Sequence, residues 1–308
     1  MASLVISYSN MRLAAPLLRD LAPRITWIYL NSTLIYCVVS NLITSLSVII
    51  SSLIHEDIMK SNLPPILLTS CVIVSDQSVS LKNENSRIRL TIESIEKWLA
   101  ISPDLHLVIC DGSNFDFSKI IFEHFPKANI ECLFFENNKK LVGLYGKGYG
   151  EGEIVNYALQ NSAYLKQSDF FAKCTAKLWV ENFFECLDNW NGTFLCKGYF
   201  SNVFSFKKTQ FSYVDTRFYL VSKSFYLENL ASTYLDVGGE QGLSLEHCFR
   251  DVILKGKFQK IMFSVPPVIC GVGGAAGTYY KNNLKRRIKE IIRLWLVKRN
   301  KCFNFLFT

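Results

Sequence analysis

Several signatures of familiar site chemistries are missing from this chain of 308 residues. Its ten cysteines form no Cys-x-x-Cys pair, and no histidine completes a zinc-site spacing with them. No Walker sequence ending in Gly-Lys-Ser/Thr occurs, and no glycine-rich turn follows the first expected strand. These absences argue against a common zinc centre, a P-loop and a dinucleotide fingerprint, and hence against a dehydrogenase or a methyltransferase.

Excess charge is also missing from most of the chain. Lys and Arg number 34 and Asp and Glu 26, but nine of the basic residues lie between Lys281 and Lys301, against the single acid Glu290. The rest of the chain has no net charge and therefore no basic surface for the phosphates of a nucleic acid, so we expect no nucleic-acid partner. With 49% hydrophobic residues, the composition predicts one sizeable core with terminal extensions.

The uncharged segment from Ile25 to Ile54 is long enough to cross a bilayer as one helix. Its Ser, Thr and Asn residues equally suit a buried or interfacial helix pair. The arginines before it would keep the N-terminus in the cytoplasm and send the rest across, whereas the unpaired cysteines and the basic tail favour the cytoplasmic face. We therefore expect a membrane-associated protein on that face, with a single-pass protein as the alternative.

Alternating strand and helix patterns fill the middle of the chain. Buried strands are predicted at 66–74, 105–110, 130–136 and 169–174, and helices at 86–100, 117–125 and 151–163. This order predicts an α/β domain over residues 63–280, with a Rossmann-type, mostly parallel sheet flanked by helices. Residues 1–62 form a hydrophobic segment and residues 281–308 a basic amphipathic helix. The aromatic-rich stretch 183–226 suits an antiparallel or loop-built half.

Polar residues follow the first two predicted strands, at the edge where ligands bind in open parallel sheets. Ser75 follows the first strand, and Asp111 follows the second in the sequence Asp111-Gly112-Ser113. A carboxylate at this place can accept hydrogen bonds from a ribose or a base. The alternative is a turn cap, because Asp-Gly-Ser is common turn chemistry.

A glycine-rich stretch follows the third strand. It runs Lys147-Gly148-Tyr149-Gly150-Glu151-Gly152 and precedes the helix expected from Glu151. Glycines let backbone amides approach a ligand, and a helix start offers unpaired N–H groups to an anion. Lys147, Gly148 and Gly150 are therefore candidate anion contacts, with a plain flexible loop as the alternative.

The order of these motifs resembles the GT-A-type glycosyltransferases, especially bacterial enzymes that build surface polysaccharides such as lipopolysaccharide and capsule. The matching pieces are Thr69 to Ile73, Ser86-Arg87, Val108 to Ser113, Lys147 to Gly152 and Phe171-Ala172-Lys173. The likeness extends over about Leu63 to Gly274. It implies a nucleotide-sugar donor and a glycan or lipid-linked acceptor.

One motif of that class is absent. After the fourth strand, where an Asp-x-Asp metal site is expected, the chain has Lys173-Cys174-Thr175-Ala176-Lys177. A hard divalent cation needs carboxylate oxygens, so we expect no metal and no other cofactor. Cationic side chains would then neutralise the donor phosphates, although each alone is typical of a surface charge. The nominated cations are Lys147, Lys173, Lys177 and Arg217, and the resemblance adds Arg87 as a donor-binding residue.

Glu246, in the helix expected over Leu243 to Asp251, is the candidate catalytic base that takes the proton of the acceptor hydroxyl. The alternative is an ordinary ion pair with Arg250 at i,i+4. Two further functions stay open: a membrane-associated nucleotide-sugar-binding protein without catalysis, and another Rossmann-like transferase.

The basic tail predicts an amphipathic helix. Its apolar residues share one broad face between flanks of Lys and Arg, which is typical of a helix lying on an anionic membrane. The alternative is a helix that packs this face on the domain. The residues of the face are Leu284, Ile288, Ile291, Ile292, Trp295 and Leu296.

Overall fold

The computed structural model describes residues 63–74, 79–238, 242–274 and 277–308. The predicted hydrophobic segment 1–62 and the candidate Ser75 lie outside these residues. Within the described ranges, no helix combines the length and the apolar character needed to span a bilayer.

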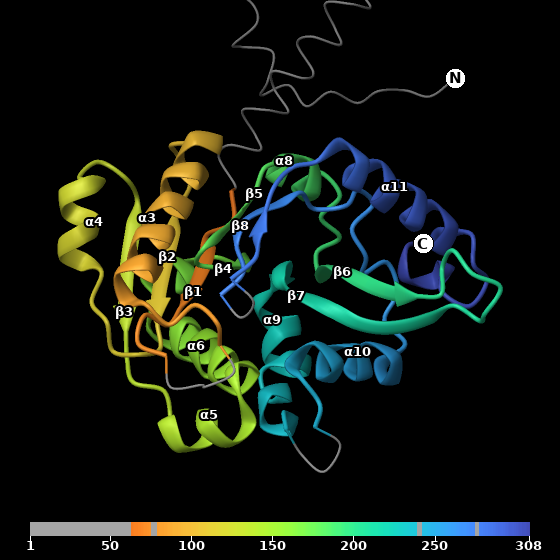
Figure 1. Cartoon of the computed structure of the whole chain (residues 1–308), viewed down its shortest axis with the longest axis horizontal. Coiled ribbons are helices and arrows are strands. Elements are labelled where there is room, and N and C mark those ends of the chain that lie inside the picture. Colours follow the sequence, from red (N-terminus) through yellow and green to blue (C-terminus); the bar gives the residue numbers. More distant parts are fainter. Residues whose placement is uncertain (1–62, 75–78, 239–241, 275–276) are drawn as a thin grey trace, which may run out of the picture. The chain divides into compact units, whose positions relative to one another are not determined.

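A six-stranded sheet with the order β3-β2-β1-β4-β7-β6 forms the centre of the domain (Figure 1). Strands β1 to β4 run parallel, whereas β7 is antiparallel to both β4 and β6. This confirms a mostly parallel, Rossmann-like α/β sheet, and the aromatic-rich stretch 183–226 supplies its antiparallel part. The strands are β1 (Ile66–Ser70), β2 (Leu107–Asp111), β3 (Ile130–Phe134), β4 (Phe170–Thr175), β6 (Phe194–Ser201) and β7 (Gln210–Ser222).

The neighbouring strands β1 and β2, both inside the sheet, are buried along their whole length. Their continuous apolar runs fit a parallel sheet that is covered on both faces. Helix α3 (Glu84–Ile101) contributes Ser94 and Trp98, whose side chains donate hydrogen bonds of 2.7 and 3.1 Å to the carbonyl of Leu178. These bonds fix the start of β5 (Leu178–Val180), directly after the end of β4.

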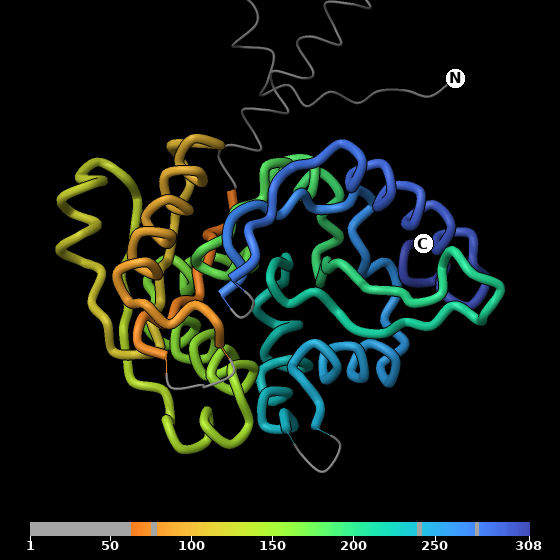
Figure 2. Tube along the Cα trace, viewed as in Figure 1, coloured from red at the N-terminus to blue at the C-terminus, as the bar shows by residue number. Residues whose placement is uncertain are grey.

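A smaller three-stranded sheet has the order β5-β8-β9. Its strands β8 (Ile269–Val272) and β9 (Tyr279–Tyr280) come from the end of the chain, and Figure 2 shows this late segment returning to the β4–β5 turn. The remaining elements are α4 (Ser118–His124), α5 (Lys139–Tyr145), α6 (Lys147–Asn161), α7 (Ala163–Gln167), α8 (Phe183–Leu187), α9 (Lys223–Phe225), η2 (Tyr226–Leu230), η3 (Thr233–Asp236), α10 (Leu245–Gly256), α11 (Leu284–Lys298) and η4 (Asn304–Leu306).

The glycine-rich stretch is helical rather than a loop, so the predicted helix start at Glu151 was wrong. Helix α6 begins at Lys147, after Gly146 with its φ of 85°. A Cβ on Gly152 would lie 2.2 Å from Cβ of Tyr234, and one on Gly150 would lie 2.8 Å from Nδ2 of Asn137. These glycines allow close packing of the helix, which the flexible-loop alternative does not explain.

Candidate functional site

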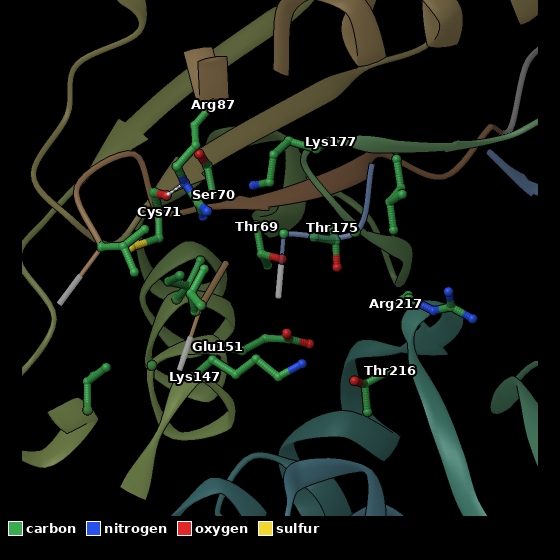
Figure 3. A pocket seen from close by; sticks show the side chains of 18 of the residues that line it. Thr69, Ser70, Cys71, Arg87, Lys147, Glu151, Thr175, Lys177, Thr216 and Arg217 are labelled. Atoms are coloured by element: carbon green, nitrogen blue, oxygen red, sulfur yellow. Dashed lines mark hydrogen bonds between the residues drawn. The ribbon is translucent and has the colours of Figure 1, made fainter. Parts of the chain in front are cut away.

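The candidate site lies where the strand order reverses. Strands β2 and β3 follow on one side of β1 and β4 on the other, so the carboxyl ends of β1 and β4 flank the crevice in which α/β sheets bind ligands. A cavity of about 200 Å³ opens there. Thr69, Ser70 and Cys71 line it from the end of β1, and Thr175 and Lys177 from the end of β4 (Figure 3).

The fold brings six of the predicted site residues to this cavity, although they come from distant parts of the chain. Those that line it are Arg87, Lys147, Gly150, Lys177, Arg217 and Glu246. Gly148, Asp111 and Lys173 are not among the lining residues. A Cβ on Gly148 would instead lie 3.0 Å from Cβ of Leu245 at the start of α10.

Asp111 lies behind the cavity wall, with no surface open to a ligand. Its Oδ2 accepts a hydrogen bond from the Val72 amide at 3.0 Å, and its Oδ1 accepts from the Ser113 amide and hydroxyl at 2.8 and 2.6 Å. These are the contacts of a turn cap, and they hold the chain that follows β1. Asp111 therefore shapes the cavity through the loop, and we keep it as a positioning residue.

Two cations meet at one end of the cavity. The Arg87 Nε and Nη1 donate to the carbonyls of Cys71 and Leu81, at 2.6 and 2.8 Å. Lys177 is 3% exposed, and its ammonium has no hydrogen-bond or ion-pair partner among the described residues. A Cβ on Gly274 would lie 3.6 Å from both Arg87 Nη1 and Lys177 Nζ. Both cations therefore border the space that this glycine leaves free.

The surroundings of Lys177 disfavour the charged form of its side chain. Burial is the larger cause and Arg87 the next, and together they lower the pKa of Lys177 to about 7. Burial also lowers the pKa of Arg87. Cationic groups without a carboxylate partner gain most from a ligand that carries negative charge, so this end of the cavity suits an anion.

Lys173 is the opposite case. It is fully buried, and its ammonium pairs with Glu151 and donates to the Thr216 carbonyl at 2.7 Å. Glu151, in the first turns of α6, lines the cavity while Lys173 does not. Lys173 is thus engaged in holding Glu151, a carboxylate that our sequence analysis placed only in the glycine motif. The only sequence signal was an acid near the start of a helix, and its partner on β4 is set by the tertiary fold.

Arg217 is also engaged. Its Nε and Nη2 donate to the two oxygens of Asp215 at 2.7 and 2.6 Å, and its guanidinium lies 4.8 Å from the ring centroid of Tyr280. Burial alone would raise the pKa of Asp215, but the hydrogen bonds and charge of Arg217 outweigh it, and the pKa is lowered. Figure 3 shows the guanidinium turned away from Lys177. The Arg217 side chain is therefore held in place and forms part of the cavity wall.

Glu246 lies in the first turn of α10 and lines the cavity, with its carboxylate 4.0 Å from the Lys147 ammonium. The alternative pairing with Arg250 is wrong, because Arg250 binds Asp251 at 2.6 Å and the Ser212 carbonyl at 2.7 Å. Glu246 therefore faces the cavity together with Glu151 and Lys147.

The residues at the end of β4 do not fit a divalent metal. Thr175 and Lys177 lie where the Asp-x-Asp of the resembled class is expected, and the nearby carboxylate of Glu151 is paired with Lys173. In the part of the chain that the structure describes, no three His, Cys, Asp or Glu side chains gather to hold a metal ion. A hard cation needs several free oxygen ligands, which this donor set does not provide.

No known family model matches the chain, and neither does any curated protein. Solved structures do match. A Desulfovibrio desulfuricans protein with the proposed role of nucleotide-diphospho-sugar transferase has 9% identity and a TM-score of 0.40, over 66% of this chain and 80% of that one. The galactosyltransferase LgtC, solved with donor and acceptor sugar analogues, has 10% identity and a TM-score of 0.39, over 65% and 72%.

The inositol-1-phosphate CTP transferase of T. maritima has 14% identity and a TM-score of 0.39, over 78% of this chain and 97% of that one. At such identities and TM-scores these matches carry no argument about fold family, donor, acceptor or reaction.

Proposed function

We propose that this chain is a glycosyltransferase that moves a sugar from a nucleotide-sugar donor to an acceptor hydroxyl without a divalent metal. One observation carries the proposal: Arg87 and Lys177, which have no carboxylate partner among the residues that the structure describes, converge on one end of a cavity at the switch point of the sheet. Two carboxylates, Glu151 and Glu246, face the same cavity. A diphosphate fits the first group, and sugar hydroxyls fit the second.

The donor diphosphate binds between Arg87 and Lys177 in this proposal, close to the start of α6. Lys147 and Gly150 lie in the first turn of that helix and line the cavity. The free amides and positive dipole of a helix N-terminus add to the attraction for phosphate. The nucleoside lies against residues 69–71, at the end of β1 and next to the loop that Asp111 holds.

The transfer step needs a base and a stabilised leaving group. The acceptor oxygen bonds to the anomeric carbon as the bond from that carbon to the phosphate oxygen breaks, and Glu246 takes the acceptor proton. The nucleoside diphosphate leaves with one more negative charge on its terminal phosphate. Lys177 and Arg87 stabilise that charge in the place where a metal would otherwise act.

A donor-binding protein without turnover is the second candidate. It is favoured by the position of the two carboxylates, since Glu151 is paired with Lys173 and Glu246 lies 4.0 Å from Lys147. Release of nucleoside diphosphate distinguishes the two. Binding of a sugar nucleotide without release, in the presence of glycan and glycolipid acceptors, would select the second candidate.

The first experiment is thermal stabilisation by a panel of sugar nucleotides, each with and without a chelator. We expect at least one of them to raise the melting temperature equally under both conditions, and Lys177→Met to remove the effect. The matched control is Lys127→Met, at an exposed lysine that does not line the cavity. Stabilisation that needs a divalent cation would contradict the proposal.

The acceptor that we propose is a glycan or lipid-linked sugar in the synthesis of a cell-surface polysaccharide. The resemblance to bacterial polysaccharide enzymes supports this role, as does the basic C-terminal helix, which we expect to hold the enzyme at a membrane. We place the enzyme at the cytoplasmic face, because bacterial sugar nucleotides are found inside the cell. The single-pass alternative depends on residues outside the described ranges.

A further inference from the structure

Helix α11 exposes a stripe of apolar side chains to solvent. Five of these residues are between 46% and 72% exposed, namely Leu284, Ile288, Ile291, Ile292 and Trp295. At 3.6 residues per turn they fall on one side of the helix. The other side faces the domain, where Val297 is buried and Glu290 pairs with Lys197 at 2.8 Å. The alternative in which the apolar face packs on the domain is therefore wrong.

Basic residues border the stripe. On the helical projection, Lys285 and Lys289 lie along one edge and Arg287 along the other. The Arg299 guanidinium stacks on the Trp295 ring at 3.8 Å from its centroid, which keeps a cation at the end of the stripe. The helix's one acid, Glu290, is turned toward the domain and does not reduce the charge of the outer face.

The connection between β6 and β7 lies beside α11 and carries further apolar and basic side chains. Residues 202–209 carry Phe204, which is 52% exposed, and Phe206, which is fully exposed, followed by Lys207 and Lys208. The Lys289 ammonium and the Arg293 guanidinium lie 5.9 and 5.6 Å from the centroid of the Phe204 ring. The hairpin and α11 are thus in contact, as Figure 1 also shows.

We propose that α11 and residues 202–209, together the basic-apolar face, form one docking surface for an anionic lipid membrane. The apolar stripe and Phe206 enter the headgroup layer, while the lysines and arginines around them meet lipid phosphates. The surface joins two segments that lie about eighty residues apart in the chain. It is independent of the reaction proposed for the cavity.

Charge complementarity favours a membrane over the other occupants. A second copy of the same face would bring like charges together, and the uncharged segment from Ile25 to Ile54 would leave the cations unmatched. A nucleic acid would satisfy the cations but leave the apolar stripe and both phenylalanines without a partner. An anionic bilayer satisfies both groups.

The opposite side of α11, which faces the domain, adjoins the cavity. The Arg286 guanidinium lies 5.5 Å from the ring centroid of Tyr280, and Tyr280 lines the cavity. A protein docked through α11 therefore holds that edge of the cavity near the lipid surface, which suits an acceptor that is carried on a lipid.

The test is flotation of the full chain with vesicles of phosphatidylcholine, alone or mixed with phosphatidylglycerol. We expect tighter binding to the mixed vesicles, and we expect high salt to remove the difference. The uncharged N-terminal segment should bind both kinds of vesicle equally. A preference for the mixed vesicles therefore reports binding through the basic-apolar face. Equal binding to both would overturn the proposal.

Three variants locate the surface. Lys285→Gln combined with Lys289→Gln should weaken binding to the mixed vesicles about fivefold per charge removed. Phe206→Ser and Ile288→Ser should each weaken it roughly tenfold, because an apolar side chain no longer enters the lipid. The control is Phe122→Ser, at a 74% exposed phenylalanine on α4, which should change nothing.

Unchanged binding of Phe206→Ser would overturn the joint surface. The proposal would also be overturned if the variants lost self-association in sedimentation, or lost binding to an oligonucleotide, but still bound vesicles as before. Far-ultraviolet circular dichroism of each variant checks that it is folded. The substituted side chains are all exposed, and we expect no loss of structure.

Discussion

The two walls of the cavity hold their charges in opposite ways. On the wall formed by β1, α3 and the β4–β5 turn, Arg87 and Lys177 have no carboxylate partner among the described residues. On the wall formed by α6, β7 and α10, the cations Arg217 and Lys147 each have one, namely Asp215 and Glu246. Glu151 on this wall is paired as well, with the buried Lys173 of β4.

The same difference separates Lys173 from Lys177, although the two residues lie in one strand and the turn that follows it. Both lysines are buried, but Lys173 is paired, whereas Lys177 has no hydrogen-bond or ion-pair partner within the described ranges. A buried charge without a partner is costly, so the fold leaves Lys177 to be satisfied by something that enters the cavity. In the proposed function, phosphate binds at the first wall, and the sugar hydroxyls and the proton transfer belong to the second.

The largest effect is expected for the base on the second wall. Glu246→Gln keeps the shape of the side chain but cannot accept the acceptor proton, so turnover should fall roughly 10²- to 10⁴-fold. Donor affinity, measured by calorimetry, should stay unchanged. The matched control is Glu228→Gln at an exposed position away from the cavity. Full turnover by Glu246→Gln would remove it as the base.

Breaking the buried pair tests the structural role of the same wall. Lys173→Met leaves Glu151 without its partner, and the side chain of Glu151 is 22% exposed, so part of the lost interaction is replaced by water. We expect the free energy of unfolding to fall by about 3 kcal/mol, the lower end for such pairs. Denaturant titration measures it, with Lys127→Met as the exposed control. A loss no larger than in the control would show that the pair does not stabilise this wall.

On the first wall, Lys177→Met should lower the affinity for a sugar nucleotide roughly 10- to 100-fold, the range for a hydrogen bond between charged groups. It should not lower stability, because it removes a buried ammonium group that has no partner among the described residues. Calorimetry and denaturant titration give the two numbers. Unchanged affinity would place the diphosphate elsewhere.

The pH dependence gives a smaller effect with a definite sign. The groups that act on Lys177 are Arg87, Cys71 and Asp111, and its pKa in the empty protein is about 7. Bound phosphate favours the charged form, so affinity should fall as pH rises above 7, by at most about tenfold per unit. In Lys177→Arg, the charge persists and the affinity should be flat. A flat profile in the unsubstituted protein would contradict the role of Lys177.

The same shift affects folding. The pKa of Lys177 is about 7 in the folded protein against an ordinary value of 10.5. Between these values the unfolded chain binds more protons, so the contribution of Lys177 to the free energy of unfolding rises with pH across that window.

Local patterns predicted much of the fold. The strand over Ile130–Phe134 and the helix around Ser118–His124 follow from runs and periodicities of side chains that are close in sequence. The start of α6 was not predictable this way. Its glycines are explained by Tyr234 and Asn137, which pack on the helix from other parts of the chain.

The candidate site shows the same division. Arg87, Lys177 and Glu246 could be nominated from residue type and motif, and all three line the cavity. The position of Asp111 depends on strand order, because the cavity lies between β1 and β4 while Asp111 ends β2. Likewise, the partners of Lys173 and Arg217 are set by the tertiary packing.

The central claim is that cationic side chains, not a metal, receive the leaving diphosphate. It is tested most directly by release of nucleoside diphosphate from the sugar nucleotide selected by the stability screen, with and without a chelator. We predict the same rate in both conditions and a large loss in Lys177→Met. Turnover that appears only when Mg²⁺ or Mn²⁺ is added would contradict the claim.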